Sequence, residues 1–181
     1  ELFHAEMRHL NTDSDSEVLL NIFAHELGKQ RAILPSKKHF FQAVKKTHSR
    51  CHGAYAVLAL ITGFGLLAFR DPRGIRPLVI GARQGKTQKE YIIASENSSF
   101  SALGYTTLRD VDPGEAVFID THGQLHSQQC ADNPEPMPCL FEYVYLARPD
   151  STLDQISVYK ARMRMGQKLA NKITNINPNH D

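Results

Sequence analysis

The chain has 181 residues, with 21 lysines and arginines against 19 aspartates and glutamates, and it is 41% hydrophobic and 22% charged. These values are ordinary for a globular protein and exclude a disordered chain, a collagen-like fibre and a disulfide scaffold. A net charge of +2 gives no reason to expect nucleic acid or an anionic membrane surface as a partner, because both are bound by concentrated basic charge.

The cysteines and the apolar stretches bear on where the chain resides. Cys51, Cys130 and Cys139 are an odd number without a C-x-x-C pair, so their spacing predicts neither a disulfide framework nor a zinc site, and we expect a cytoplasmic protein. The longest apolar stretch, residues 54–69, is shorter than the roughly 20 residues of a membrane helix. No signal peptide is recognisable, and the start at Glu1 within a helical pattern predicts a segment of a longer protein.

Two helices are predicted in the first fifty residues. Ser14 and Glu17 fit an S-x-x-E capping box, and the apolar residues that follow recur at helical spacing as far as Gly28. Asp15 takes the first helical position, where the positive end of the helix dipole favours a carboxylate. A second helix is predicted to begin near Ser36 and to bury three apolar side chains, Phe40, Phe41 and Val44.

From residue 53 the pattern changes to short apolar runs separated by turn residues. Two buried strands joined by a glycine-containing turn are predicted within residues 54–71. Further strands are predicted at residues 76–81, 90–94, 115–120 and 124–128, with a short helical turn at residues 98–103. Because most connections have hairpin length, we expect an antiparallel sheet covered by helices on at least one face, and the fold class is α+β.

The last third of the chain is predicted to hold a strand and a helix. Residues 139–146 (CLFEYVYL) resemble a strand, in which Phe141, Tyr143 and Tyr145 would share one face as packed core or as an interface. Residues 156–173 are predicted to form the final helix.

No complete catalytic set follows from the residues themselves. There is no nucleophile elbow, phosphate-binding loop or His-Glu-x-x-His motif, and Cys51 and His52 are adjacent residues whose side chains point apart. Asp15 is either a carboxylate that complements the helix dipole or an anion that captures a substrate ammonium group. The charged turn at residues 70–77 is expected to have a structural role.

Taken together, several stretches are similar to the glutamine phosphoribosylpyrophosphate amidotransferase family. They are NTDSDSEVLLNIFAHEL at residues 11–27, AFRDPRGIRPLVIG at 68–81, LRDVDPGEAVFI at 108–119 and CLFEYVYLARPDSTLDQISVYKARMRMGQKLA at 139–170. The combination of FEYVYLARPDS with RDPRGIRP is highly specific, and the similar stretches follow the family order over nearly the whole chain.

The resemblance implies the second half of an N-terminal-nucleophile glutaminase domain over residues 1–151, with two antiparallel sheets between layers of helices. Residues 152–181 would be a helix and linker leading toward a phosphoribosyltransferase domain. In the family order, the nucleophilic cysteine, the glutamine-binding arginine and the Asn-Gly oxyanion pair precede Glu1, and the pyrophosphate loop follows Asp181. The resemblance therefore assigns no catalytic residue to this chain, which we expect to be inactive alone.

The full-length enzyme of the family transfers ammonia from glutamine to phosphoribosylpyrophosphate and gives 5-phosphoribosylamine, the first step of de novo purine synthesis. Asp15 matches the aspartate that binds the α-ammonium of glutamine. Phe141 and Tyr145 match aromatic positions of the ammonia channel or domain interface.

The resemblance also implies cofactors and partners. It implies no metal site in this chain, Mg²⁺ with phosphoribosylpyrophosphate in the transferase domain, and no iron–sulfur cluster at Cys139. The expected partners are glutamine, the transferase domain of the same protein and further copies in a homodimer or homotetramer.

Two alternatives stay open. A catalytically inactive glutaminase-like module with a binding or regulatory role would keep the same fold. A glutaminase that serves sugar-phosphate amination or asparagine synthesis would share the Asp15 motif, but the ARPDS stretch at residues 147–151 is typical of the phosphoribosyl branch and disfavours this reading.

Overall fold

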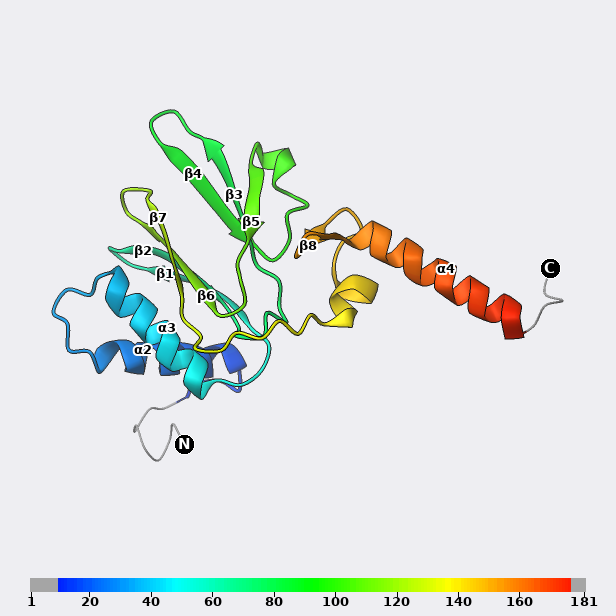
Figure 1. Cartoon of the computed structure of the whole chain (residues 1–181). Coiled ribbons are helices and arrows are strands. Elements are labelled where there is room, and N and C mark those ends of the chain that lie inside the picture. The colour runs from blue at the N-terminus through cyan, green and yellow to red at the C-terminus, as the bar shows by residue number, and fades with distance from the viewer. Residues whose placement is uncertain (1–9, 177–181) are drawn as a thin grey trace. The chain divides into compact units, whose positions relative to one another are not determined.

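A computed structural model describes residues 10–176, and its internal contacts divide the chain into two compact units. The first unit combines the described residues up to Ile75 with Val111–Met137. The second unit combines Arg76–Asp110 with the segment that begins at Pro138. Each unit has its own antiparallel sheet, so the predicted strands belong to two sheets (Figure 1).

The first unit begins with two helices, α2 (Asp15–Gly28) and α3 (Lys37–Arg50), which confirm both predicted helices. Ser36 begins α3 with a reciprocal cap, since its backbone N–H donates to His39 Nδ1 at 3.0 Å. Such caps satisfy N–H groups that the first turn of a helix cannot pair internally. Gly28 is the last residue of α2, as the sequence predicts.

A four-stranded antiparallel sheet completes the first unit. In spatial order its strands are β1 (Ala56–Ile61), β2 (Gly65–Arg70), β6 (Glu115–Asp120) and β7 (Leu125–Gln129). All four strands confirm the sequence prediction to within two residues. The expectation that β1 is buried is wrong, because β1 is an edge strand and exposes Leu58 and Leu60 on alternate positions.

Helices α2 and α3 cover one face of this sheet, as Figure 1 shows. Phe40 of α3 lies with its ring centroid 5.0 Å from that of Phe118 in β6, and Phe23 of α2 stacks 6.2 Å from Phe69 in β2. These four side chains are at most 6% exposed. Their burial supplies the hydrophobic stabilisation that fixes the start of α2 beside the sheet.

The second unit contains a three-stranded sheet in the order β4 (Lys89–Ala94), β3 (Val79–Gln84) and β5 (Thr106–Asp110), with the 3₁₀ turn η1 (Ser101–Leu103) before β5. Strand β3 begins three residues later than predicted, because Pro77 lacks the N–H that a ladder requires. Strand β5 is not predicted from the sequence, because its residues TTLRD carry no alternating apolar pattern.

The predicted strand at residues 139–146 is wrong. Its core is η2 (Glu142–Leu146), a π-helical turn in which the Ala147 N–H donates to the Glu142 carbonyl at 2.9 Å. A two-stranded ribbon follows, formed by β8 (Thr152–Leu153) and β9 (Ile156–Ser157).

The final helix, α4 (Val158–Ile176), begins two residues later than predicted. Asp154 and Gln155 both have positive φ, 46° and 64°, and close the β8–β9 hairpin, so the chain is not helical before Val158. Every sheet pairing is antiparallel and the helices are segregated in the sequence, which confirms the α+β class. Between residues 10 and 176, no helix is long and apolar enough to cross a membrane.

Candidate functional site

The loop before α2 is held by one carboxylate. Glu17 Oε1 accepts a hydrogen bond from the Asn11 backbone N–H at 2.8 Å. Its Oε2 accepts from the N–H and the hydroxyl of Thr12, at 2.8 and 2.6 Å. The predicted Ser14–Glu17 capping box is therefore not formed. These hydrogen bonds, that from Asn11 foremost, lower the pKa of Glu17, so the carboxylate stays ionised and holds the loop.

Ser14 nevertheless caps α2 by another contact, because its hydroxyl oxygen accepts from the Ser16 N–H at 3.3 Å. Asp15 follows as the first helical residue, as predicted, and its side chain is exposed. Asp15 Oδ1 accepts a hydrogen bond from the Ser16 hydroxyl at 3.3 Å, near the limit for such a bond. The carboxylate therefore keeps acceptor capacity for a ligand.

A shallow hollow of about 410 Å³ opens beside this helix start. Its lining residues come from the loop and the first turn of α2: Leu10, Asn11, Thr12, Asp13 and Val18. The hollow brings the Asp13 carboxylate and the polar groups of Asn11 and Thr12 to one surface beside the start of α2. Such a surface can bind a small zwitterion, with its ammonium group on a carboxylate.

Phe141, Tyr143 and Tyr145 do not share one face, although the predicted strand would place them together. Tyr143 is buried and its hydroxyl donates to the Leu153 carbonyl at 3.3 Å. Phe141 and Tyr145 are 67% and 78% exposed. Residues four apart in a helix share a face, whereas the residue between them points elsewhere. Phe141 and Tyr145 thus form one exposed face of the η2 segment, and Tyr143 belongs to the core.

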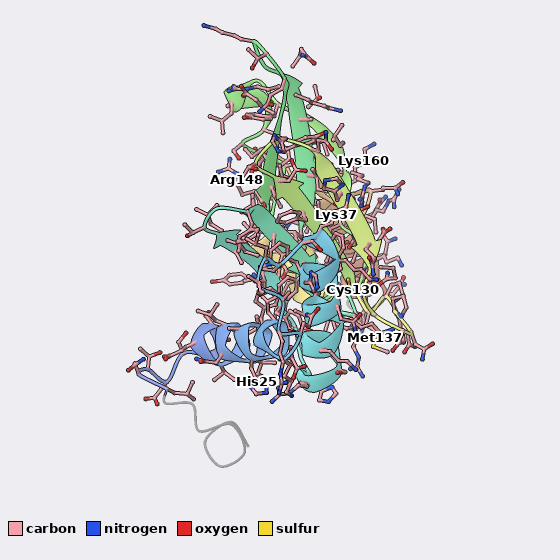
Figure 2. All side chains as sticks on the ribbon, turned by 90° about the vertical axis from the view of Figure 1, so that its left-hand side faces the viewer. His25, Lys37, Cys130, Met137, Arg148 and Lys160 are labelled. Carbon is pink, nitrogen blue, oxygen red and sulfur yellow. The ribbon has the colours of Figure 1, made fainter. Side chains whose placement is uncertain are left out.

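Neither Cys130 nor Cys51 is placed as an activated nucleophile. Cys130, which is labelled in Figure 2, is buried in the core cluster with Phe40 and Phe118. Burial raises the pKa of its thiol to about 12. Burial also raises the pKa of Cys51. A thiol with a raised pKa holds little thiolate at neutral pH. Cys139 is a partly buried free thiol. In the described part of the chain, no three His, Cys, Asp or Glu side chains form a metal-binding group.

The charged turn after β2 has the structural role that the sequence predicts, but its charges are buried. Arg70 donates to the carbonyls of Val111 and Gly74 at 2.8 and 2.7 Å. Asp71 accepts from the N–H groups of Arg73 and Ile75, at 2.9 and 3.0 Å. Both side chains are at most 2% exposed. Buried charges with hydrogen-bond partners of this kind fix a turn rather than bind a ligand.

Glu17 has a role in the candidate site that the sequence does not predict. The S-x-x-E pattern assigns Glu17 to the helix cap, since this pattern is a local signal of helix starts. The signal for its other role is the preceding polar pair, Asn11 and Thr12, which supplies donors for a carboxylate one turn into the helix.

Comparison with known proteins gives consistent results. Residues 1–102, more than half of the chain, match the family described as glutamine amidotransferase domain. Amidophosphoribosyltransferase of Pseudomonas aeruginosa is 54% identical over 181 residues, which are 100% of this chain and 36% of that protein. The Escherichia coli enzyme of the same name is 54% identical over 174 residues, 96% of this chain and 34% of that protein.

A solved structure of glutamine phosphoribosylpyrophosphate amidotransferase from Bacillus subtilis, complexed with ADP and GMP, superimposes with a TM-score of 0.74. It is 34% identical, over 92% of this chain and 33% of that chain. The chain thus spans about a third of the length of the relatives it matches. The resemblance stated from the sequence is confirmed, and the chain belongs to the glutamine amidotransferase domain family.

Proposed function

We propose that this chain is part of a glutamine-dependent amidophosphoribosyltransferase. Such an enzyme transfers ammonia from glutamine to phosphoribosylpyrophosphate and gives 5-phosphoribosylamine, the first step of de novo purine synthesis. The observation that carries the proposal is the 54% identity to the Pseudomonas aeruginosa enzyme across all 181 residues. The aligned region includes both the start of α2 and the η2 segment.

In the proposed enzyme, Asp15 binds the α-ammonium group of glutamine. The carboxylate is exposed at the N-terminus of α2, the end of a helix at which acidic residues are favoured. The Glu17 hydrogen bonds fix the loop of Asn11 and Thr12 beside it. A fixed carboxylate selects an amino acid over a simple amide, because a charged hydrogen bond to the ammonium group is made only by the amino acid.

The nucleophile is proposed to come from a cysteine outside this chain, which would be inactive alone. The raised pKa values of Cys51 and Cys130 support this assignment. Phe141 and Tyr145 are proposed to line the ammonia channel or the domain interface, where an apolar wall keeps ammonia from protonation and loss to water.

We further propose a cytoplasmic homo-oligomer that takes Mg²⁺ with phosphoribosylpyrophosphate in its transferase domain and has no iron–sulfur cluster. Metal and iron analysis of the purified full-length protein tests the cofactor part of this proposal.

The substitution Asp15→Asn in the full-length protein tests the substrate assignment. We expect the KM for glutamine to rise about tenfold to hundredfold, the cost of one charged hydrogen bond, while synthesis from ammonium stays close to the wild-type rate. Glu135→Gln, which neutralises an exposed carboxylate outside this loop, is the matched control and should leave the KM for glutamine nearly unchanged.

The outcomes separate the possible errors. If Asp15→Asn lowered synthesis from glutamine and from ammonium equally, the role of Asp15 would be contradicted, but the proposed function of the protein would not. A wild-type protein that makes no 5-phosphoribosylamine from either nitrogen donor would contradict the proposed function and favour an inactive glutaminase-like module. Mass spectrometry of the mature N-terminus of the full-length protein identifies the nucleophile, for which we expect cysteine.

A further inference from the structure

The η2 segment is a rare kind of helix with two contrasting faces. Its hydrogen bond from Ala147 N–H to the Glu142 carbonyl spans five residues, the mark of a π-helical turn. π-Helical turns are uncommon and occur often at functional sites. One face exposes Phe141 and Tyr145, and the other buries Tyr143. The position of the exposed face is therefore set by whatever holds this short turn.

Arg162 of α4 holds the end of this turn. Its Nε donates to the Tyr143 carbonyl at 2.7 Å, and its Nη2 donates to the Ala147 carbonyl at 2.8 Å. The last carbonyl groups of a helix have no partner within the helix, so they need an external donor. A guanidinium group supplies two donors in a fixed planar arrangement, and each bond is strengthened by its charge.

Two other residues, Arg76 and Glu96, hold the segment by three hydrogen bonds. Arg76 Nη1 donates to the Glu142 carboxylate at 2.6 Å. Beyond η2, the Glu96 carboxylate accepts from the Arg148 N–H at 2.8 Å and from the Ser151 hydroxyl. These contacts anchor both ends of the segment to residues of the second unit.

Arg162 differs from these anchors because it lies on α4. The first N–H groups of α4 also bind this region, since the Val158 N–H donates to the Ser151 carbonyl and the Tyr159 N–H to the Pro149 carbonyl, both at 3.1 Å. A displacement of α4 would therefore move Arg162 and, with it, the Tyr143 and Ala147 carbonyls on either side of Tyr145. Rigid contacts of this kind carry coupling between sites.

We propose that Arg162 is a positioning residue that links α4 to the exposed face of Phe141 and Tyr145 and thereby keeps ammonia transfer coupled to glutamine hydrolysis. The inference rests on the proposed function, in which α4 leads toward the transferase domain. It adds a residue that touches neither substrate and acts through backbone carbonyls alone.

The substitution Arg162→Met in the full-length protein tests the link, because methionine keeps an unbranched chain and removes every donor. The readout is 5-phosphoribosylamine formed per glutamate released, measured at saturating glutamine and phosphoribosylpyrophosphate. We expect this ratio to fall about threefold to tenfold, within the roughly twofold to thirtyfold range of residues that couple two sites. Arg164→Met, an exposed arginine two residues further along α4, is the matched control and should keep the wild-type ratio.

Arg162→Lys gives a second variant that keeps the charge and restores at most one of the two carbonyl contacts, and we expect an intermediate ratio. A wild-type ratio in both Arg162 variants would overturn the inference. An equal fall in the rate of 5-phosphoribosylamine synthesis with glutamine and with added ammonium would overturn it too, because a purely structural role of Arg162 would lower both rates. If the wild-type protein makes no product from either donor, the proposed function fails first.

Discussion

His48 is a buried histidine whose charge state should govern the acid stability of the first unit. Its side chain lies in α3, 6% exposed, with Nδ1 2.8 Å from the Tyr55 hydroxyl and its ring edge-on to Phe69. The opposite nitrogen, Nε2, has no hydrogen-bond partner of normal geometry among the described residues. The Gly114 carbonyl and the Asp71 carboxylate favour the charged form, but burial outweighs both and lowers the pKa of His48 to about 4.

The sign and size of the effect follow from the two pKa values. An unfolded-state pKa of 6.5 above a folded-state pKa of about 4 means that the unfolded chain binds the proton more tightly. The free energy of unfolding is therefore highest above pH 6.5 and falls as the pH drops toward 4. At about 1.4 kcal/mol per pKa unit, the loss is about 2 kcal/mol by pH 5 and about 3 kcal/mol by pH 4.

Urea unfolding followed by circular dichroism between pH 7.5 and pH 4 measures this dependence for the wild type and for His48→Phe. The phenylalanine variant loses the hydrogen bond to Tyr55, so its free energy of unfolding at pH 7.5 should be lower than that of the wild type. It should lack the part of the fall in this free energy at acidic pH that His48 causes. His52→Asn, which removes an exposed imidazole next to the end of α3, should keep the wild-type curve. Parallel curves for wild type and His48→Phe would refute the assignment.

Two further predictions concern a strand glycine and the loop carboxylate. Gly65→Ala should destabilise the protein by about 3 kcal/mol in urea unfolding, because φ is 143° and the added Cβ would lie 2.1 Å from the Ile119 carbonyl oxygen. Gly63→Ala, with φ 81° and open space, should cost about 1 kcal/mol, and equal costs would contradict the steric argument. Glu17→Ala should raise the KM for glutamine several-fold in steady-state assays, whereas an unchanged KM would show that the loop needs no such support.

The elements that sequence reasoning predicted well are those whose local pattern agrees with their burial. Helix α3 begins after Ser36 and buries Phe40, Phe41 and Val44 as its helical spacing predicts. Strand β6 has the predicted bounds, because its apolar run is buried between β2 and β7. Strand β5 has no such local pattern, since its mostly polar residues pair at a sheet edge and show no amphipathic period, so the sequence does not predict it.

The η2 segment shows where local propensity fails. The sequence CLFEYVYL is rich in aromatic and β-branched residues, which favour a strand. The contacts that impose a helical turn come from Arg76 and Arg162, 66 and 19 residues away from their partners Glu142 and Tyr143. Interactions this distant in sequence override a local preference, and no pattern within the segment reveals them.

At the start of α2, the sequence motif predicts the helix boundary correctly but assigns Glu17 to a contact that it does not make. A local reading of Ser14-Asp15-Ser16-Glu17 assigns every polar group to the helix start, with Glu17 on the cap and Asp15 on the dipole. In the structure Ser14 alone makes the cap, and Glu17 is committed to Asn11 and Thr12. Asp15 keeps one marginal contact, to the Ser16 hydroxyl. Glu17 thus fixes a loop beside an exposed carboxylate, and the proposed binding of an ammonium group at Asp15 would use this arrangement, because a carboxylate beside a fixed loop binds at a lower entropic cost.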